Sequence, residues 1–157
     1  MPRVITRSRA PLRLGLAGGG TDLSPYCDEF GGAVLNWTID RFAYAFIERR
    51  TDGKVEFSAK DIGVSEILDV SQVEESKLLL HRGVYQRISS MYPQVGPMSV
   101  TVTTTVDAPP GSGLGSSSAL VVALVEAFRT HLDLQLGPYD VARLAYEIGR
   151  ASCRERV

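Results

Sequence analysis

Glycines and serines are concentrated in one short segment, Pro109–Ala119, which reads PPGSGLGSSSA. Its three glycines let the backbone adopt positive φ and come close to a ligand. Its three serines stand where a helix would begin, and the first four amides of a helix have no partner inside it. Because the positive end of the helix dipole lies there too, the segment predicts a binding site for phosphate.

Two common phosphate motifs do not fit this segment. A P-loop needs Lys followed by Ser or Thr after its last glycine, and the chain has Ser116 and Ser117 there. The dinucleotide fingerprint needs a third glycine where GSGLGS has Ser, and an acidic residue at the right distance in a following strand. From the spacing alone, a plain Gly-Ser turn whose serines cap a helix remains an open alternative.

A second glycine-rich segment, Ala10–Asp22 (APLRLGLAGGGTD), lies near the N-terminus. Together the two segments resemble the motifs of the GHMP kinases, the family of galacto-, homoserine, mevalonate and phosphomevalonate kinases. The first segment resembles the family pattern P-x-x-x-G-L-G-S-S-A, and Gly-Gly-Gly-Thr-Asp resembles the first motif of its sugar kinases. With Gly31–Ala33 and the following VLNWTID, the likeness points to the D-glycero-D-manno-heptose 7-phosphate kinases and covers most of Val4–Glu147.

This resemblance implies an ATP-binding domain of an enzyme that transfers a phosphoryl group from ATP to a hydroxyl of a sugar or sugar phosphate, with Mg²⁺. It implies nucleotide contacts from Pro110, Gly111, Ser112, Gly113, Leu114, Gly115, Ser116, Ser117 and Ser118, of which Ser117 would also bind Mg²⁺. It implies substrate contacts from Arg13, Gly19, Gly20, Thr21 and Asp22. Without the family, Asp22 is equally well explained as the cap of the turn that follows it.

The last ten residues, IGRASCRERV at 148–157, match the translation of a common sequencing adapter. We therefore expect residues 1–147 to be a truncated N-terminal domain whose natural sequence continues with other residues. The alternative is that residues 148–157 are the native end of a helix. The resemblance sets the second Mg²⁺ ligand, a Glu, at Gly149, and places the catalytic Asp and the C-terminal domain beyond the chain. Glu147 would point to another helix face. No catalytic residue is assigned, and we expect weak or no turnover.

Composition limits the other function classes. The chain has 157 residues, enough for one domain with a core, and a net charge of −1 without a basic stripe. That charge argues against nucleic acid as a main partner. No apolar run is long enough for a membrane span and no secretory signal is recognised, so we expect a cytoplasmic protein with a small-molecule substrate. A non-catalytic phosphate-binding module, an RNA-binding or scaffold domain, and a galactokinase- or fucokinase-like enzyme stay as alternatives.

The periodicity of the chain predicts an α+β fold that places these motifs between strands and helices. The resemblance implies its form, a ribosomal-protein-like two-layer sandwich with a mixed, mostly antiparallel sheet and helices on one face. The predicted strands are Val4–Arg9, Leu12–Leu16, Ala33–Ile39, Phe42–Arg50, Lys54–Lys60, Ile67–Val70 and Met98–Val106. The predicted helices are Glu74–Tyr92, Ala119–Leu132 and Tyr139–Ile148, with a shorter one at LSPYCDEF.

A few single residues could carry other roles. Phe42, Tyr44 and Phe46 alternate along one strand, and core packing explains them better than a base-stacking platform, because no basic groove accompanies them. Trp37 is expected in the core or in the wall of a pocket. The two histidines are expected to be surface or packed residues rather than metal ligands.

Overall fold

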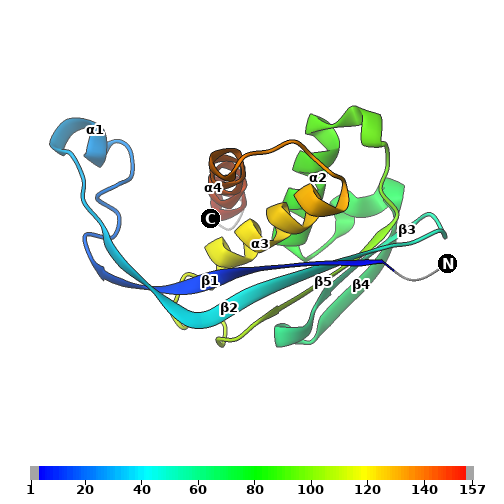
Figure 1. The fold of residues 1–157 in the computed structure, drawn as a ribbon, viewed down its shortest axis with the longest axis horizontal. Helices are drawn as coiled ribbons and strands as arrows, with labels where there is room; N and C mark the ends of the chain where they lie inside the picture. The colour runs from blue at the N-terminus through cyan, green and yellow to red at the C-terminus, as the bar shows by residue number, and fades with distance from the viewer. Residues whose placement is uncertain (1–3, 155–157) are drawn as a thin grey trace.

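The computed structural model describes residues 4–154, with side chains described as far as Gly149. One sheet forms one layer, and helices α2, α3 and α4 cover one of its faces (Figure 1). The strands are β1 (Ile5–Ala17), β2 (Leu35–Arg49), β3 (Lys54–Ala59), β4 (Val64–Asp69) and β5 (Val100–Val106). The helices are α1 (Tyr26–Phe30), α2 (Leu79–Met91), α3 (Ser116–His131) and α4 (Pro138–Arg154), with short 3₁₀ helices η1 (Lys60–Ile62), η2 (Val70–Glu75) and η3 (Pro93–Val95).

The sheet has the order β1-β2-β5-β3-β4. Three of its pairings are antiparallel, and the pairing of β3 with β5 is parallel. The mixed, mostly antiparallel sheet with helices on one face confirms the predicted α+β class. Because β5 lies between β2 and β3, the segment after β2 must cross the start of β5 before β3 begins.

The first strand is longer than the sequence indicated. Two short strands broken at Pro11 were predicted, but β1 runs without interruption through Pro11, with a register shift between Pro11 and Arg13. The prediction was wrong because β1 is an edge strand, where a residue without an N–H group removes no ladder bond on its outer side. The two predicted strands on either side of Asp40 are likewise one strand, β2.

Helix boundaries also shift. The predicted helix at Glu74–Tyr92 begins only at Leu79, because residues 70–75 form η2 instead. The last helix extends past Ile148 to Arg154, so its backbone includes part of the segment expected to be foreign. Among residues 4–154, no helix combines the length and the apolar character needed to cross a bilayer.

The core lies between the sheet and the three covering helices. Phe57, Tyr85 and Phe128 meet there edge to face, with ring centroids 5.9 and 6.3 Å apart along the series. His81 is buried among them, and its Nε2 lies 2.9 Å from the Oγ1 of Thr104 on β5. The packed role expected for this histidine is therefore confirmed.

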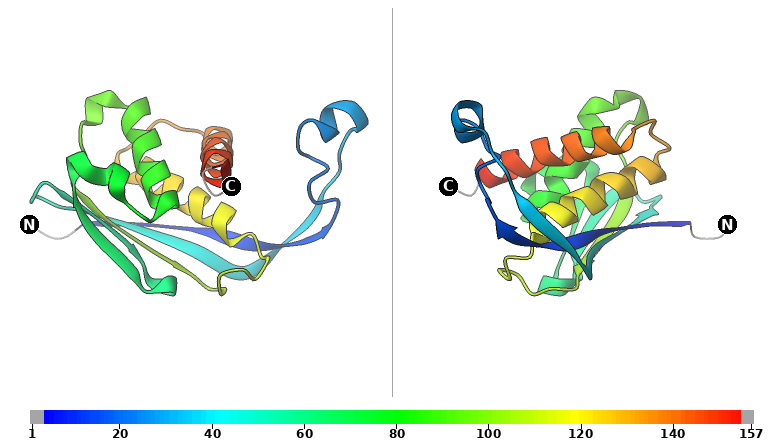
Figure 2. Two further views of the ribbon diagram at one scale, coloured as in Figure 1. Left: turned by 180° about the vertical axis from the view of Figure 1, so that it is seen from behind. Right: turned by 60° about the vertical axis from the view of Figure 1, so that its left-hand side comes forward.

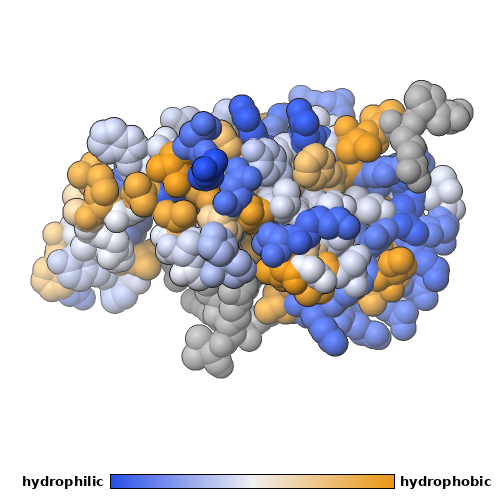
Figure 3. Space-filling model, turned by 90° about the horizontal axis from the view of Figure 1, so that it is seen from below, coloured by the Kyte–Doolittle hydropathy of each residue, from blue (hydrophilic) through white to orange (hydrophobic). Residues whose placement is uncertain are grey.

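The alternating aromatics of β2 do not belong to this core. Ala43, Ala45 and Ile47 face the helices and are fully buried, so Phe42 and Tyr44 lie on the opposite, open face of the sheet. There the guanidinium of Arg9 stacks over Phe42, 4.4 Å from the ring centroid. The core prediction was wrong because period-two alternation defines two faces without saying which one the helices cover. Figure 3 looks onto this open side, where apolar patches lie among hydrophilic residues.

Candidate phosphate-binding site

The glycine- and serine-rich segment forms the loop between β5 and α3, as the periodicity predicted. Its start is fixed to β2 at Asp107. The backbone N–H of Asp107 donates to the Phe42 carbonyl over 2.9 Å, and the Asp107 carboxylate accepts the Phe42 N–H, also over 2.9 Å. Sequence reasoning did not single out Asp107, although a carboxylate directly after a strand and before Pro-Pro-Gly is a signal that could have found it.

The loop itself uses the conformation that its glycines permit. Gly111, Gly113 and Gly115 have φ of 80°, 73° and 71°. Side chains with a Cβ rarely adopt this left-handed region, so glycine is the natural residue at each position. Ser112 closes a turn within the loop through its N–H, which donates to the Pro109 carbonyl over 3.3 Å.

The loop leads into the first turn of α3. The N-cap is Gly115, which has no side chain, and no side chain of the described residues caps this end. The first amide of this helix that is hydrogen-bonded is that of Ala119, which donates to the Gly115 carbonyl over 3.0 Å. Ser117 and Ser118 are exposed. The serines therefore do not cap the helix, and the plain Gly-Ser turn does not account for them.

Unpartnered amides at the start of a long helix suit an anion. The amides of Ser116, Ser117 and Ser118 make no hydrogen bond to any described residue, and they lie where the helix dipole is positive. α3 is 16 residues long, so its dipole is developed along more than four turns. This geometry fits the phosphates of a nucleotide, whose oxygens would accept these N–H groups.

Arg13 is brought to this loop by β1. Its N–H donates to the Leu114 carbonyl over 3.0 Å. Its side chain lies across Gly115, where an added Cβ would be 3.0 Å from Nε and 3.1 Å from Cγ of the arginine. Arg13 thus supplies a cationic side chain at the N-terminal end of α3, and Gly115 leaves the room for it.

The second glycine motif lies further along the β1–β2 pair, in the connection that carries α1 (Figure 1). The Thr21 hydroxyl donates to the Gly18 carbonyl over 2.7 Å and accepts the Ala33 N–H over 3.2 Å. A Cβ on Gly18 would lie 1.9 Å from the Ala33 carbonyl oxygen, and one on Gly32 would lie 2.0 Å from that of Thr21. These residues therefore close the base of the connection.

Among residues 4–154, no hydrogen bond or ion pair joins Gly19, Gly20, Thr21 or Asp22 to the phosphate loop. Asp22 is exposed, so its carboxylate is accessible to a ligand. The structure thus places Arg13 with the phosphate loop and leaves the rest of the predicted substrate set apart from it. The assignment of these residues to a sugar pocket stays a prediction.

The described residues do not form a metal site by themselves. No group of three or more His, Cys, Asp or Glu within that range could hold an ion. Ser117 offers one hydroxyl. Glu147 is paired with Arg87 of α2 at 2.8 Å, which agrees with the expectation that it points away from the site. At Gly149, by contrast, an added Cβ would meet no atom within 4 Å.

Comparison with known proteins relates the chain to a family of kinases. The profile described as "GHMP kinases N terminal domain" matches residues 80–156. The D-glycero-alpha-D-manno-heptose 7-phosphate kinase of Campylobacter jejuni is 43% identical over 148 residues, which cover 92% of this chain and 43% of that enzyme. A galactokinase of Roseiflexus is 32% identical over 147 residues, which cover 92% of this chain and 35% of that enzyme.

A solved structure shares the fold as well. The crystal structure of a D-glycero-D-manno-heptose 1-phosphate kinase from Bacteroides thetaiotaomicron has a TM-score of 0.80 and is 46% identical, over 92% of this chain and 47% of that one. The chain therefore spans less than half the length of these relatives.

Proposed function

Because the chain belongs to the GHMP kinase family and carries its N-terminal domain, we propose that it is the nucleotide-binding part of a kinase that phosphorylates a sugar phosphate. The proposed donor is ATP and the proposed acceptor is D-glycero-D-manno-heptose 7-phosphate. The single observation that carries the proposal is the α3 N-terminus, where unpartnered amides meet the side chain of Arg13.

In this proposal the chain contributes binding and orientation. Transfer of a phosphoryl group needs positioning and neutralisation of charge more than covalent chemistry. The amides at the start of α3 would donate to the β- and γ-phosphate oxygens, and the Arg13 guanidinium would add positive charge beside them. Asp22 would accept hydrogen bonds from the hydroxyls of the sugar and so align the acceptor.

Mg²⁺ is part of the family's chemistry, but the described residues supply only the Ser117 hydroxyl for it. A cation of this kind prefers several oxygen ligands, including carboxylates. The family resemblance puts the missing carboxylate at position 149, where this chain has glycine. We therefore assign no step to the metal, and we propose that these 157 residues have weak or no turnover on their own.

The nucleotide part of the proposal is tested by calorimetric titration of the chain with ATP. We expect binding, and weaker binding by Ser117→Ala, because this hydroxyl stands beside the unpartnered amides. Ser65→Ala is the matched control, since Ser65 is exposed on β4, outside the loop. Absence of ATP binding by the unmodified chain would contradict the nucleotide proposal, and equal affinities of Ser117→Ala and the control would remove Ser117 from the site.

The acceptor is tested with the full-length product of the source gene in a coupled assay of ADP release. We expect turnover with D-glycero-D-manno-heptose 7-phosphate and little with galactose. The galactokinase of Roseiflexus makes galactose the relevant competitor, at 32% identity. Preference for galactose would assign the full-length protein to the galactokinases instead. ATP binding without turnover on either sugar by the full-length protein would favour a non-catalytic module.

A further inference from the structure

The far part of the β1–β2 pair projects from the rest of the molecule. We call residues 13–38, which include α1, the arm; Figures 1 and 2 show it leaving the helical layer and ending in α1. Nearly every side chain of the arm is exposed, including large apolar ones that are between 43% and 71% exposed. These are Leu14, Leu16, Leu23, Tyr26, Phe30, Leu35 and Trp37. Several large apolar side chains exposed on one projecting element indicate a site of interaction.

The β1 strand shows which face of the arm lacks a cover. Residues two apart on a strand point to the same side. Leu12 is fully buried in the core, whereas Leu14, next in phase, is 43% exposed. The apolar side of β1 therefore continues past the place where the helices end.

The β2 strand repeats this pattern from the other direction. Ile39 packs against the core, whereas Trp37 and Leu35, next in phase, are 66% and 58% exposed. Leu14 and Trp37 are direct partners in the ladder between the strands, so their side chains share one side. The exposed apolar surface of the arm is thus a continuation of the core-facing side of the sheet.

The arm is held in one shape by regular contacts. The ladder continues through the pairs Arg13–Thr38 to Ala17–Leu35. Beyond it, the Thr21 hydroxyl and the close approach at Gly18 and Gly32 fix the two chains against each other. A surface that is already shaped loses little conformational entropy when a partner docks.

Two observations identify the partner. The Campylobacter and Bacteroides kinases are more than twice as long as the part that this chain covers, which is 43% and 47% of them. The C-terminal end of α4 lies on the core-facing side of the sheet, and in the right-hand view of Figure 2 it is at the side of the helical layer from which the arm leaves. The polypeptide that follows α4 in a longer protein would start on the uncovered side of the arm.

We propose that the core-facing side of the arm is the docking surface for the C-terminal part of the intact kinase. The occupant would be an apolar face of that part, which completes the core begun by the helices. The proposal rests on the family assignment in the proposed function, because the relatives provide the longer chain. It has a second consequence: the docked part would hold Gly18–Asp22 in a fixed position relative to Arg13.

Trp37 provides the measurement, because it is the one tryptophan in the sequence. In the 157-residue chain its fluorescence should be that of an indole in water and should be strongly quenched by acrylamide. In the full-length protein the Trp37 signal, isolated by subtracting a Trp37→Phe variant, should shift to the blue, and its quenching constant should fall severalfold. This readout needs no kinase activity, so it remains informative if the proposed reaction is wrong.

A pair of variants separates docking from folding. Leu14→Asp should leave the thermal unfolding of the 157-residue chain unchanged, because Leu14 is exposed there, and should lower the unfolding temperature of the full-length protein. Ile67→Asp is the matched control: Ile67 is 57% exposed on β4, outside the arm, and should change neither protein.

Three outcomes would overturn the proposal. Equal quenching of Trp37 in the short and full-length proteins would mean that the C-terminal part docks elsewhere. Protection of Trp37 that increases with the concentration of the short chain would assign the arm to a second copy. Equal effects of Leu14→Asp on both proteins would make Leu14 a residue of the N-terminal domain alone.

Discussion

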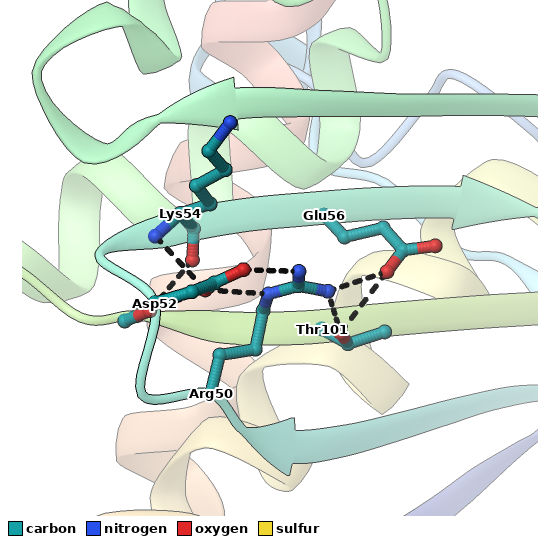
Figure 4. Close-up of polar contacts among 6 residues, drawn as sticks. Arg50, Asp52, Lys54, Glu56 and Thr101 are labelled. Carbon is teal, nitrogen blue, oxygen red and sulfur yellow. Dashed lines mark hydrogen bonds and ion pairs between the residues drawn. The ribbon is translucent and has the colours of Figure 1, made fainter.

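The two ends of β5 are built in opposite ways. Before Val100, the crossing segment between β2 and β3 is held by charged side chains (Figure 4). Arg50 donates to Asp52 through Nε and Nη2, over 3.0 and 2.6 Å, and to Glu56 through Nη1 over 2.7 Å. After Val106, the loop is held by backbone bonds and the Asp107 anchor, and the amides of Ser116, Ser117 and Ser118 have no partner among residues 4–154.

The difference predicts that the two ends of β5 serve different purposes, stability at one end and ligand binding at the other. At the crossing end, the donors of Arg50 are satisfied by carboxylates of the chain, and hydrogen bonding to Arg50 holds the pKa of Asp52 well below its usual range. At the loop end, the donors are backbone amides that the protein leaves open. Substitutions at the first end should therefore change stability, and substitutions at the second should change affinity for phosphate.

The largest expected effect is a loss of folding stability at acidic pH. It arises at His81 in the core and not at either end of β5. Burial lowers the pKa of His81 to about 4, from an ordinary value of 6.5. The unfolded chain takes up a proton below 6.5 and the folded protein does not, so stability falls as the pH drops from 6.5 toward 4. The loss attributable to His81 is about 3 kcal/mol.

Denaturant unfolding at several pH values measures this loss. His81→Gln, which can keep a hydrogen bond to Thr104, should show a flatter pH dependence across this window, although its overall stability is lower. A pH slope in His81→Gln as steep as in the unmodified chain would contradict the assignment to His81.

Arg50→Ala should have the next largest effect. It leaves the partly buried Glu56 carboxylate without its partner and loosens the crossing segment, and we expect a loss of about 2 kcal/mol in the free energy of unfolding. Arg129→Ala is the matched control, because its partner Glu126 lies one helical turn away on α3 and the pair is more exposed. That control should cost about 0.5 kcal/mol.

Chemical unfolding compares the free energies of unfolding of the two arginine variants. An ATP titration shows whether Arg50→Ala also changes the affinity for ATP at the loop end. The contrast between the ends predicts that Arg50→Ala binds ATP as the unmodified chain does. Equal losses of stability in Arg50→Ala and Arg129→Ala would contradict the structural role of Arg50. Weaker ATP binding by Arg50→Ala would contradict the separation between the two ends of β5.

At the loop end, Gly115→Ala should cost about 1 kcal/mol of stability, as expected for a Cβ at positive φ. ATP affinity should fall at least about tenfold, or about 1.4 kcal/mol, because the new Cβ would push Arg13 away from the phosphates. Gly63→Ala is the control, since Gly63 has a similar φ of 67° and open space around it.

Gly63→Ala should lose similar stability and keep full ATP affinity. Unfolding curves and titrations of both variants decide the matter. If the two glycine variants bound ATP equally well, the loop end would not be the phosphate site.

The smallest effect on stability is expected for Gly149→Glu, which should raise it by about 0.5 kcal/mol, because the position is open and Glu is a better helix former than Gly within α4. If the family pattern holds, the new carboxylate should raise ATP affinity only in the presence of Mg²⁺. Gly149→Gln lacks the charge and is the control. Equal affinities of the Glu and Gln variants in Mg²⁺ would remove position 149 from the metal site.

Much of the fold follows from local sequence. The loop between β5 and α3 was predicted because glycine spacing and the change from period two to a helical pattern occur within a dozen residues. The bounds of α2 and the continuity of β1 were missed, because each depends on a neighbour. η2 replaces the first turn of the predicted helix. Because β1 is an edge strand, Pro11 does not interrupt its pairing with β2.

The sequence by itself determined that a strand, a glycine-rich loop and a helix follow one another at residues 98–132, because φ preferences and helix ends are properties of neighbouring residues. Only the tertiary structure decided that Arg13, about a hundred residues earlier, lies against Gly115. It also decided that Trp37 is exposed on the arm and that the aromatics of β2 lie outside the core. Alternation fixes which side chains share a face, whereas the packing of distant elements decides which face is covered.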